Sequence, residues 1–253
     1  YHPNNPQKFK LPTIVSTVAA YDTATGNLKA LMDGVFLTAF RTGAASAVAS
    51  KLLANPDSKV LGLIGCGAQS ITQLHAISRI FDLSQVLYYD ITPSAMESFP
   101  DRCLDLAQNL SLVAADTSAI VQQADIICTA TSIDIGAGPL FSGIATQAHV
   151  HINAVGSDFP GKVELPLDLL QNGFVCPDFP AQAIREGECQ QLQPEEIAPD
   201  IIAVAKDPGR YTWVQSSRSV FDSTGIALED LVCMELFMEC AEQLNLGTRV
   251  KIE

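Results

Sequence analysis

The stretch Val60-Leu-Gly-Leu-Ile-Gly65-Cys-Gly-Ala-Gln-Ser70 indicates the fold of this chain. An apolar run rich in branched side chains ends at Gly65, and a glycine-spaced turn leads into a helical pattern from Gln69 to Ile80. A second apolar run, Val86-Leu-Tyr-Tyr-Asp90, ends in a carboxylate. Strand, tight turn, helix, strand and terminal acid follow one another in the order of a dinucleotide-binding βαβ unit.

The residues of this turn suit a dinucleotide. Gly65 permits the turn, and Gly67 lets backbone N–H groups approach a pyrophosphate at the positive end of the helix dipole. Asp90 can accept hydrogen bonds from both ribose hydroxyls and repels a 2′-phosphate, which predicts NAD as the cofactor. Ser70 stands where Gly or Ala is usual. The alternative is a tight turn in an α/β domain that binds nothing.

Composition narrows the class of protein. The chain has 253 residues, 47% of them hydrophobic and 17% charged, which is typical of a well-buried α/β enzyme. The net charge of −13 argues against nucleic-acid and anionic-membrane partners. No apolar run reaches the roughly 20 residues that span a bilayer, and no signal peptide is recognised, so a cytoplasmic location is expected.

The cysteines and histidines show no metal-ligand spacing. The seven cysteines include no CxxC pair, which predicts buried free thiols in a reducing compartment and no metal site. Cys66, inside the glycine turn, is interpreted as a small filler rather than a nucleophile. His149 and His151 flank a strand start, where ordinary hydrogen bonding is expected.

Strands alternate with helices along most of the chain, which predicts a parallel, doubly wound Rossmann sheet. Before it, residues 11–32 form a hairpin whose turn takes positive φ at Gly26 and Asn27. A helix over 33–54 follows, and residues 182–212 are expected to be loop and short helix. A last helix is expected from Ile226 to Leu244, with Gly247 as the glycine that terminates it. The other expected strands are 60–65, 86–90, 112–114, 125–131, 149–155, 173–177 and 218–222, and the other helices 68–80, 93–109 and 117–123.

Two domains are expected. Residues 56–220 form the Rossmann domain, and residues 1–55 with the return helix in 221–253 form a second, smaller α/β domain for substrate binding and dimerisation. The hairpin has apolar residues on both faces, and a hairpin alone is barely stable. It is therefore expected to join a sheet continued by a partner subunit, giving a homodimer.

Candidate catalytic residues follow the carboxyl ends of the predicted strands, where doubly wound sheets bind ligands. Asp158 lies in Gly156-Ser-Asp-Phe-Pro-Gly161-Lys162, a loop stiffened by two glycines and a proline. Such a carboxylate can move protons or bind an ammonium, and it can equally cap its own turn. The other polar residues at these ends are Thr129, Thr131, Ser132, Ser157, Asp222, Ser223 and Thr224.

Arg41 and Thr42 lie in a helix rich in small residues. An arginine there can hold a substrate carboxylate bidentately, and Thr42 can reach a phosphate. The alternative for Arg41 is an interdomain salt bridge.

Taken together, these motifs resemble the ornithine cyclodeaminase/μ-crystallin family over nearly all of the chain. The resemblance implies an NAD(P)-dependent enzyme acting on amino or imino acids, usually dimeric, with a Rossmann domain and a second dimerising domain. The segments that carry it are Leu31-Met-Asp-Gly, Leu37-Thr-Ala-Phe-Arg41-Thr-Gly-Ala-Ala-Ser46-Ala, Gly65-Cys-Gly-Ala-Gln69, Gly156-Ser-Asp158-Phe-Pro-Gly-Lys162-Val-Glu164, Arg185-Glu-Gly-Glu188 and Phe221-Asp-Ser-Thr-Gly225-Ile-Ala.

The resemblance implies a role for each matched residue. Asp158 matches the catalytic aspartate, which binds the substrate nitrogen and manages protons, and Arg41 would bind the substrate carboxylate. The mu-crystallin branch lacks that aspartate. The residues implied in cofactor binding are Thr42, Gly65, Gly67, Ala68, Gln69, Asp90, Thr131, Asp222, Ser223 and Thr224. A further segment that helps to bind the carboxylate and to choose the side chain would precede Tyr1.

The leading interpretation is an NAD-dependent cyclodeaminase that converts ornithine to proline or lysine to pipecolate with release of ammonia. The alternatives are a net oxidoreductase, such as an alanine dehydrogenase or a cyclic imine reductase, and a non-catalytic NAD(P)-binding protein.

Overall fold

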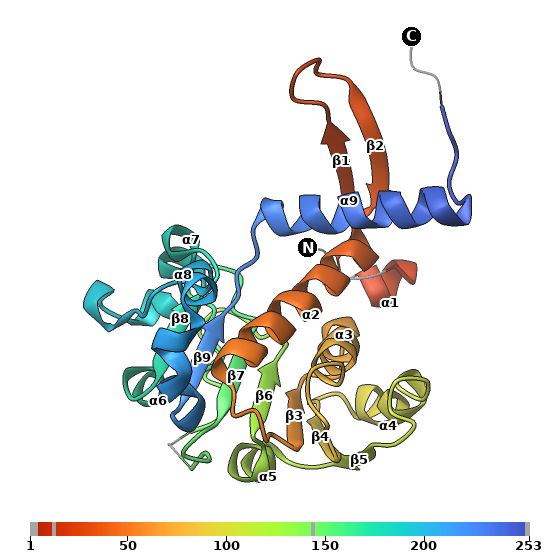
Figure 1. Cartoon of the computed structure of the whole chain (residues 1–253). Helices are drawn as coiled ribbons and strands as arrows, with labels where there is room; N and C mark the ends of the chain where they lie inside the picture. Colours follow the sequence, from red (N-terminus) through yellow and green to blue (C-terminus); the bar gives the residue numbers. More distant parts are fainter. Residues whose placement is uncertain (1–4, 12–13, 143–144, 251–253) are drawn as a thin grey trace. The chain divides into compact units, whose positions relative to one another are not determined.

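The computed structural model describes residues 5–11, 14–142 and 145–250 (Figure 1). The chain divides into two compact units. Residues Tyr1–Arg41 and Ile226–Glu253 make up the first, here called the terminal unit, and Thr42–Gly225 make up the central unit. Helix α2 (Gly34–Leu53) runs from the first unit into the second.

The central unit contains a seven-stranded parallel sheet in the order β5-β4-β3-β6-β7-β9-β8. The predicted doubly wound Rossmann sheet is confirmed. Each strand falls within or beside its predicted range, because buried parallel strands read as short apolar runs. The strand bounds are β3 Val60–Ile64, β4 Gln85–Tyr89, β5 Ser111–Ala114, β6 Ile126–Thr129, β7 His151–Ala154, β8 Phe174–Pro177 and β9 Ser219–Asp222.

The strand order reverses between β3 and β6. From β3 the chain moves through β4 to β5 at one edge, and β6 then pairs with the other side of β3. The carboxyl ends of β3 and β6 therefore lead into loops that diverge, and ligands of such sheets bind at this point. The glycine turn that follows β3 begins there.

Helices cover both faces of this sheet. On one face the core gathers Leu61, Leu63 and Val86 with side chains from α2, α3 and α4. On the other it gathers Ile64, Ile127 and Ile152 with side chains from α5, α6 and α7. The helix bounds in this unit are α3 Ala68–Ile77, α4 Pro93–Arg102, α5 Thr117–Gln123, α6 Leu167–Gln171, α7 Pro180–Glu186 and α8 Ile201–Lys206.

Two predicted helices are longer than the observed ones. The helix predicted over 93–109 ends at Arg102, and Cys103 is its C-cap. The helix predicted over 68–80 ends at Ile77, where Ser78 is the C-cap. The region 182–212 contains the expected loops and short helices, including the 3₁₀ segments η1 Glu188–Gln191, η2 Pro194–Glu196 and η3 Pro208–Ser216.

The terminal unit holds α1 (Asn5–Phe9), an antiparallel hairpin of β1 (Thr17–Tyr21) and β2 (Leu28–Asp33), the first turns of α2, and α9 (Ala227–Leu244). Its core combines Ala20, Leu37, Cys233 and Met234, which are buried together. The hairpin is confirmed, although its first strand begins at Thr17 rather than Leu11, and residues 12–13 lie outside the described part.

Two predicted backbone details are wrong in this unit. Gly26 takes a positive φ of 73°, but Asn27 is not among the described residues with positive φ, because one left-handed residue completes the turn. Helix α9 ends at Leu244, and Asn245, at φ 54°, takes the left-handed position after it that was expected of Gly247. None of the described helices is long and apolar enough to cross a membrane.

Candidate functional site

The glycine turn after β3 leaves the start of α3 open. Gly65 has φ +100°, and a Cβ there would lie 2.5 Å from the Ala130 carbonyl oxygen beyond β6. Gly67 is the N-cap of α3, and a Cβ there would meet no described atom within 4 Å. No described side chain caps this helix end. Its first N–H groups are therefore available to an anion such as a pyrophosphate.

The structure explains why a serine, Ser70, can stand where the dinucleotide-binding motif usually has glycine or alanine. Its side chain is fully buried, and its hydroxyl donates to the Gly65 carbonyl oxygen. The hydroxyl thus gives a partner to a carbonyl at the turn, which a glycine or an alanine could not do. Serine therefore fits this position without entering the open space in front of Gly67.

Asp90 joins the end of β4 to the glycine turn. One carboxylate oxygen accepts from the Cys66 N–H at 2.8 Å and the other from the Thr92 N–H at 2.7 Å. A carboxylate has about four acceptor positions, so two remain for ribose hydroxyls. Burial, with the Asp90 charge, raises the pKa of the Cys66 thiol to about 12. The thiol is protonated at neutral pH, which agrees with a filler role.

Arg102, which the sequence interpretation did not single out, lies beside the same turn. Its guanidinium donates to the Cys66 carbonyl oxygen at 2.6 Å and to the Ala95 carbonyl oxygen at 3.1 Å. It also lies over the Phe99 ring, 5.6 Å from the centroid. The motif ends at Asp90, so only the packing of α4 brings this cation to the turn.

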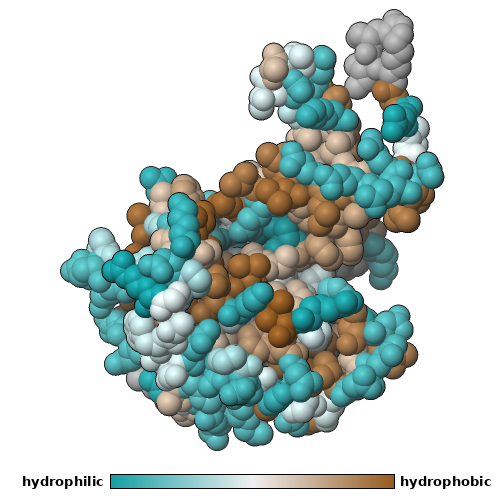
Figure 2. Space-filling view, in the orientation of Figure 1, coloured by the Kyte–Doolittle hydropathy of each residue, from teal (hydrophilic) through white to brown (hydrophobic). Residues whose placement is uncertain are grey.

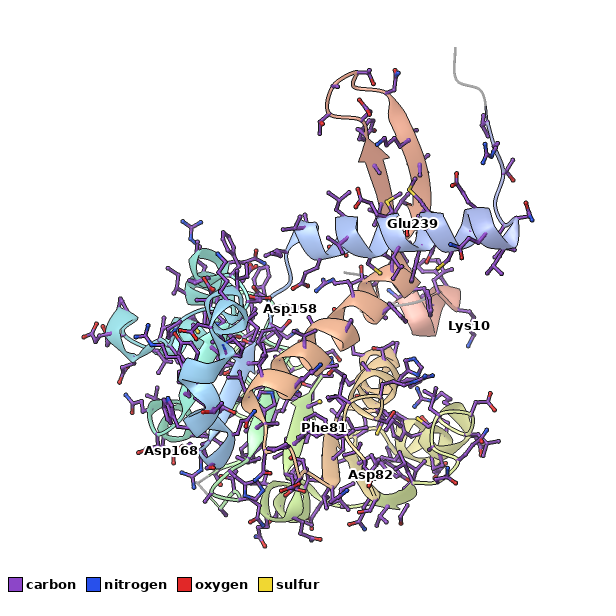
Figure 3. All side chains as sticks on the ribbon, viewed as in Figure 1. Lys10, Phe81, Asp82, Asp158, Asp168 and Glu239 are labelled. Carbon is purple, nitrogen blue, oxygen red and sulfur yellow. The ribbon has the colours of Figure 1, made fainter. Side chains whose placement is uncertain are left out.

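The loop after β7 carries an ion pair. Lys162 Nζ donates to Asp158 Oδ1 at 2.7 Å, with the Lys162 side chain 11% exposed and the Asp158 side chain 53% exposed. Figure 3 labels Asp158 on the central unit. The Asp158 carboxylate is thus paired with a nearly buried ammonium and still reaches solvent.

Glu164, at the end of this loop, connects it to the end of β6. Its carboxylate accepts from the hydroxyls of Thr129 and Thr131, both at 2.6 Å, and from the backbone of Thr131 and Gly156. The Thr131 hydroxyl, predicted to contact a cofactor, is therefore engaged by Glu164. Burial raises the pKa of Glu164.

The three polar residues predicted after β9 differ in their surroundings. Asp222 is fully buried and accepts from the Glu188 and Cys189 N–H groups, both at 2.8 Å, and burial raises its pKa to about 6. The Thr224 hydroxyl donates to Asp178 at 3.0 Å. Among the described residues, the buried Ser223 hydroxyl finds no hydrogen-bond partner. Ser223 is thus the one whose side chain is left for a ligand.

Glu164, Glu188 and Asp178 were not predicted as functional residues. Glu164 and Glu188 stand inside quoted family motifs, and their burial without a lysine or arginine partner could not be read from the sequence. Asp178 accepts from the Gly225 N–H at 2.6 Å and from Thr224, so it fixes the chain after β9.

Arg41 belongs to the terminal unit and forms ion pairs there. Its guanidinium lies 3.1 Å from Glu229 Oε2 and 3.3 Å from Asp230 Oδ1, both in the first turn of α9. These pairs lie within one unit, so they are not the interdomain salt bridge considered from the sequence. Thr42, the first residue of the central unit, is buried.

The histidines have ordinary partners. His149 Nε2 lies 2.9 Å from Asp125, and the fully buried His151 contacts Ser219 and Asn153 through its two ring nitrogens. Six cysteines are buried free thiols, as predicted, and Cys240 is exposed. The described residues include no group of three His, Cys, Asp or Glu that could hold a metal ion.

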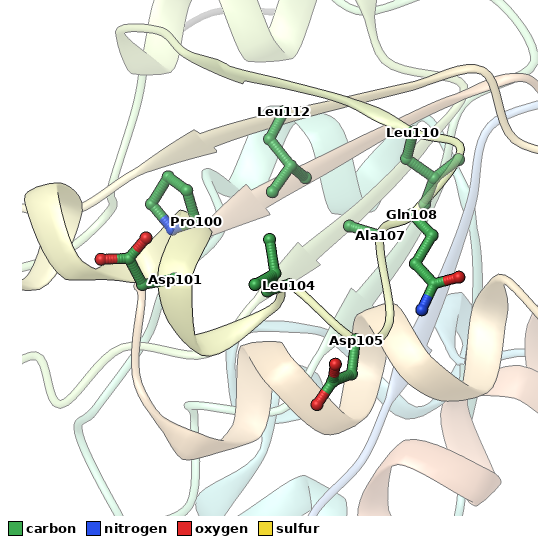
Figure 4. A pocket seen from close by; sticks show the side chains of 8 residues that line it. All are labelled: Pro100, Asp101, Leu104, Asp105, Ala107, Gln108, Leu110 and Leu112. Atoms are coloured by element: carbon green, nitrogen blue, oxygen red, sulfur yellow. The ribbon is translucent and has the colours of Figure 1, made fainter.

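A separate hollow of about 560 Å³ lies beside α4 and β5 (Figure 4). Its walls combine Pro100, Leu104, Leu110 and Leu112 with the acidic Asp101 and other side chains. None of the predicted site residues lines it, so it is distinct from the edge of the sheet that carries the motifs.

Comparison with known proteins agrees with this arrangement. The L-lysine cyclodeaminase of Streptomyces rapamycinicus is 42% identical over 253 residues, which are 100% of this chain and 73% of that protein. A structure described as the basis for recognition of L-lysine, L-ornithine and L-2,4-diaminobutyric acid by lysine cyclodeaminase has TM-score 0.96 and 52% identity, covering 100% of this chain and 73% of that one. An archaeal alanine dehydrogenase dimer with bound NAD has TM-score 0.87 and 30% identity, covering 100% and 78%.

These relatives are enzymes, and they share the fold described above. The sequence model of the ornithine cyclodeaminase/mu-crystallin family matches residues 1–245. The chain therefore belongs to the ornithine cyclodeaminase/mu-crystallin family.

Proposed function

We propose that this protein is an NAD-dependent cyclodeaminase of basic L-amino acids, converting lysine to pipecolate, or ornithine to proline, with release of ammonia. The observation that carries the proposal is the Asp158–Lys162 pair, held at the same carboxyl edge of the sheet as the open glycine turn. The likeness to lysine cyclodeaminases over all of this chain supports the substrate class.

The central unit has the features that NAD requires. The open space at Gly67 and the uncapped start of α3 suit a pyrophosphate, and Asp90 keeps acceptor positions for a ribose. The buried Ser223 hydroxyl, without a partner among the described residues, offers a further polar contact. Bound NAD would supply the oxidation of the substrate Cα–N bond and the closing reduction. No net redox change results.

Asp158 would manage the protons of this reaction. Its exposed carboxylate can pair with the substrate ammonium and take up a proton as that nitrogen becomes an imine. Lys162, whose side chain is nearly buried, holds the carboxylate in place through their ion pair. The distal amine of the substrate attacks the imine carbon, the original amino group leaves as ammonia, and the ring forms. Arg41 is proposed to bind the substrate carboxylate.

The test combines product analysis with one variant. The protein is incubated with L-lysine and with L-ornithine at substoichiometric NAD⁺, and products are identified by mass spectrometry while NADH is followed by absorbance. Cyclic imino acid and ammonia without accumulated NADH are expected. NADH formed in step with a keto acid would instead support the second candidate, a net amino-acid dehydrogenase, which the likeness to an alanine dehydrogenase favours.

Asp158→Asn should lower kcat by about 10²–10⁴-fold while NADH affinity stays near wild type, because the pyrophosphate contacts lie on another loop. Asp168→Asn is the matched control. Asp168 is an exposed carboxylate in the first turn of α6 in the same unit and is also labelled in Figure 3. A kcat above about a tenth of wild type in Asp158→Asn would exclude the assigned role.

We also propose a homodimer formed through the terminal unit. This unit exposes large apolar side chains on the hairpin and on α9, and Figure 2 shows hydrophobic side chains gathered there. They include Leu31 at 64% and Leu228 at 58% exposure. A two-stranded hairpin has little stability of its own, so a second copy that continues its sheet would cover this surface. Sedimentation at micromolar concentration should give a dimer, and a monomer would contradict the proposal.

A further inference from the structure

The segment from Gly156 to Glu164 is a closed loop. Glu164 Oε2 accepts from the Gly156 N–H at 3.0 Å, so the last residue of the loop is bound to the first. A Cβ at Gly156 would collide with the Glu164 carboxylate. Inside the loop, the Ser157 hydroxyl donates to the Lys162 carbonyl oxygen at 2.6 Å. The direction of the Asp158 side chain therefore depends on where Glu164 holds the loop.

Glu164 fastens this loop to the end of the neighbouring strand β6. Its Oε2 also accepts from Thr129 Oγ1 at 2.6 Å, and its Oε1 accepts from the Thr131 N–H at 2.8 Å and from Thr131 Oγ1 at 2.6 Å. The carboxylate thus has four donors, which fill its acceptor positions, and it is fully buried. It has no position left for a ligand, so it cannot act as a catalytic residue.

Two further buried carboxylates hold Glu164 in turn. Glu188 Oε1 accepts from the Glu164 N–H at 2.7 Å, and Glu188 Oε2 accepts from the Leu165 N–H at 3.2 Å. Asp222 accepts from the N–H groups of Glu188 and Cys189. Asp222 thus binds the backbone at Glu188, and Glu188 binds the backbone at Glu164. Together the three carboxylates connect β9, the turn at 187–189, the loop at 156–164 and the end of β6.

We propose that Glu164 is a positioning residue that acts through Asp158. It holds the Asp158–Lys162 pair and the Thr131 segment in one fixed arrangement, and Glu188 and Asp222 hold Glu164. This inference rests on the proposed cyclodeaminase function. Burial of a carboxylate is unfavourable unless its oxygens are satisfied, so four donors within one short segment make a rigid support.

The test is a double-mutant cycle between Glu164 and Asp158 with lysine as substrate. Glu164→Gln keeps the size of the side chain but replaces one carboxylate oxygen with an amide N–H₂. The amide nitrogen cannot accept from the Gly156 N–H or the Thr131 N–H, each of which can only donate. We expect kcat to fall about 10–100-fold, because small misplacements of reacting groups have effects of this size. In the Asp158→Asn background the same substitution should lower kcat less than about twofold, because the residue through which it acts is already inactive.

A milder variant keeps the test decisive if Glu164→Gln folds poorly. Thr129→Val removes one of the four donors with little change of shape. It should lower kcat in the wild-type background and leave kcat nearly unchanged in the Asp158→Asn background. Asp116→Ala is the control for stability alone. Asp116 caps α5 by accepting from the Ala119 N–H at 2.7 Å, so the variant should melt earlier with unchanged kcat.

The outcomes separate the two proposals. If Asp158→Asn alone leaves kcat unchanged, the proposed role of Asp158 fails. If Asp158→Asn is slow and Glu164→Gln lowers kcat equally in both backgrounds, Glu164 acts independently of Asp158 and the positioning role is overturned. An unchanged kcat in soluble, folded Glu164→Gln would overturn it as well.

Discussion

Alanine substitutions at Gly65 and Gly67, two positions apart in one turn, should separate folding from cofactor binding. Gly65 has φ +100°, which side chains rarely adopt, and its added methyl group would lie 2.5 Å from the Ala130 oxygen and 3.0 Å from the Ala130 carbonyl carbon. Gly67 has φ −79°, which any residue adopts, and its methyl group would meet no described atom within 4 Å. The first substitution strains the protein, and the second only occupies the open space.

The magnitudes follow from these contacts. Backbone strain at Gly65→Ala costs about 1–3 kcal/mol and overpacking about another 1–3 kcal/mol. For a chain of this size, a loss of about 2–6 kcal/mol lowers Tm by roughly 4–24 °C. Gly67→Ala should change stability by less than about 1 kcal/mol. If its methyl group removes one charge-assisted hydrogen bond to a pyrophosphate, it costs about 1.5–3 kcal/mol of binding, or about 10–150-fold in the Kd for NADH.

Thermal denaturation without cofactor and calorimetric titration with NADH measure the two effects on the same samples. Gly65→Ala should melt early, whereas Gly67→Ala should melt like wild type and bind NADH weakly. Two results would refute the reasoning: a Gly67→Ala variant that loses as much stability as Gly65→Ala, or one that binds NADH as tightly as wild type. The second would mean that the dinucleotide does not approach this turn.

Three further predictions concern single residues. Wild type should bind NADH at least about tenfold more tightly than NADPH. Asp90→Ser should reduce this preference, because it removes the carboxylate that repels a 2′-phosphate while the Arg102 cation remains beside the turn. Competitive titrations in which wild type binds NADPH as tightly as NADH, or more tightly, would contradict this prediction. Arg41→Lys should raise KM for lysine and lower kcat/KM, with a loss of transition-state stabilisation of about 1.5–3 kcal/mol, while NADH affinity stays nearly unchanged. An equal loss of NADH affinity would make Arg41 a structural residue. Burial lowers the pKa of His151 to about 4 from 6.5, so its stabilisation is complete above the unfolded-state value and is lost as the pH falls toward the folded-state value. The free energy of unfolding, measured in urea, should therefore fall by about 2 kcal/mol between about pH 7 and about pH 5, and His151→Asn should not show this fall. An equal pH dependence of the unfolding free energy in both proteins would rule out this assignment.

The sequence predicted the elements that depend on local pattern. Short apolar runs gave the seven strands, and their alternation with helices gave the parallel sheet. The same local reasoning located the glycine turn, Asp90 at the end of β4 and Asp158 after β7, because residues that follow parallel strands meet at one edge of the sheet. It failed at helix ends: α4 stops at Arg102, well before Asn109, and Asn245 rather than Gly247 takes the left-handed position directly after α9.

Tertiary structure decided which groups these residues meet. Glu164 contacts Thr129 and Thr131 because β6 and β7 are neighbours in one register. Asp222 binds the backbone N–H of Glu188 because β9 lies beside β8, the strand that leads through α7 to this residue. Arg102 reaches the glycine turn only through the packing of α4. A sequence determines local backbone preference through side-chain shape and periodicity. The hydrogen bonds of a buried carboxylate join segments far apart in the chain, so only the folded arrangement of the sheet and its loops fixes them.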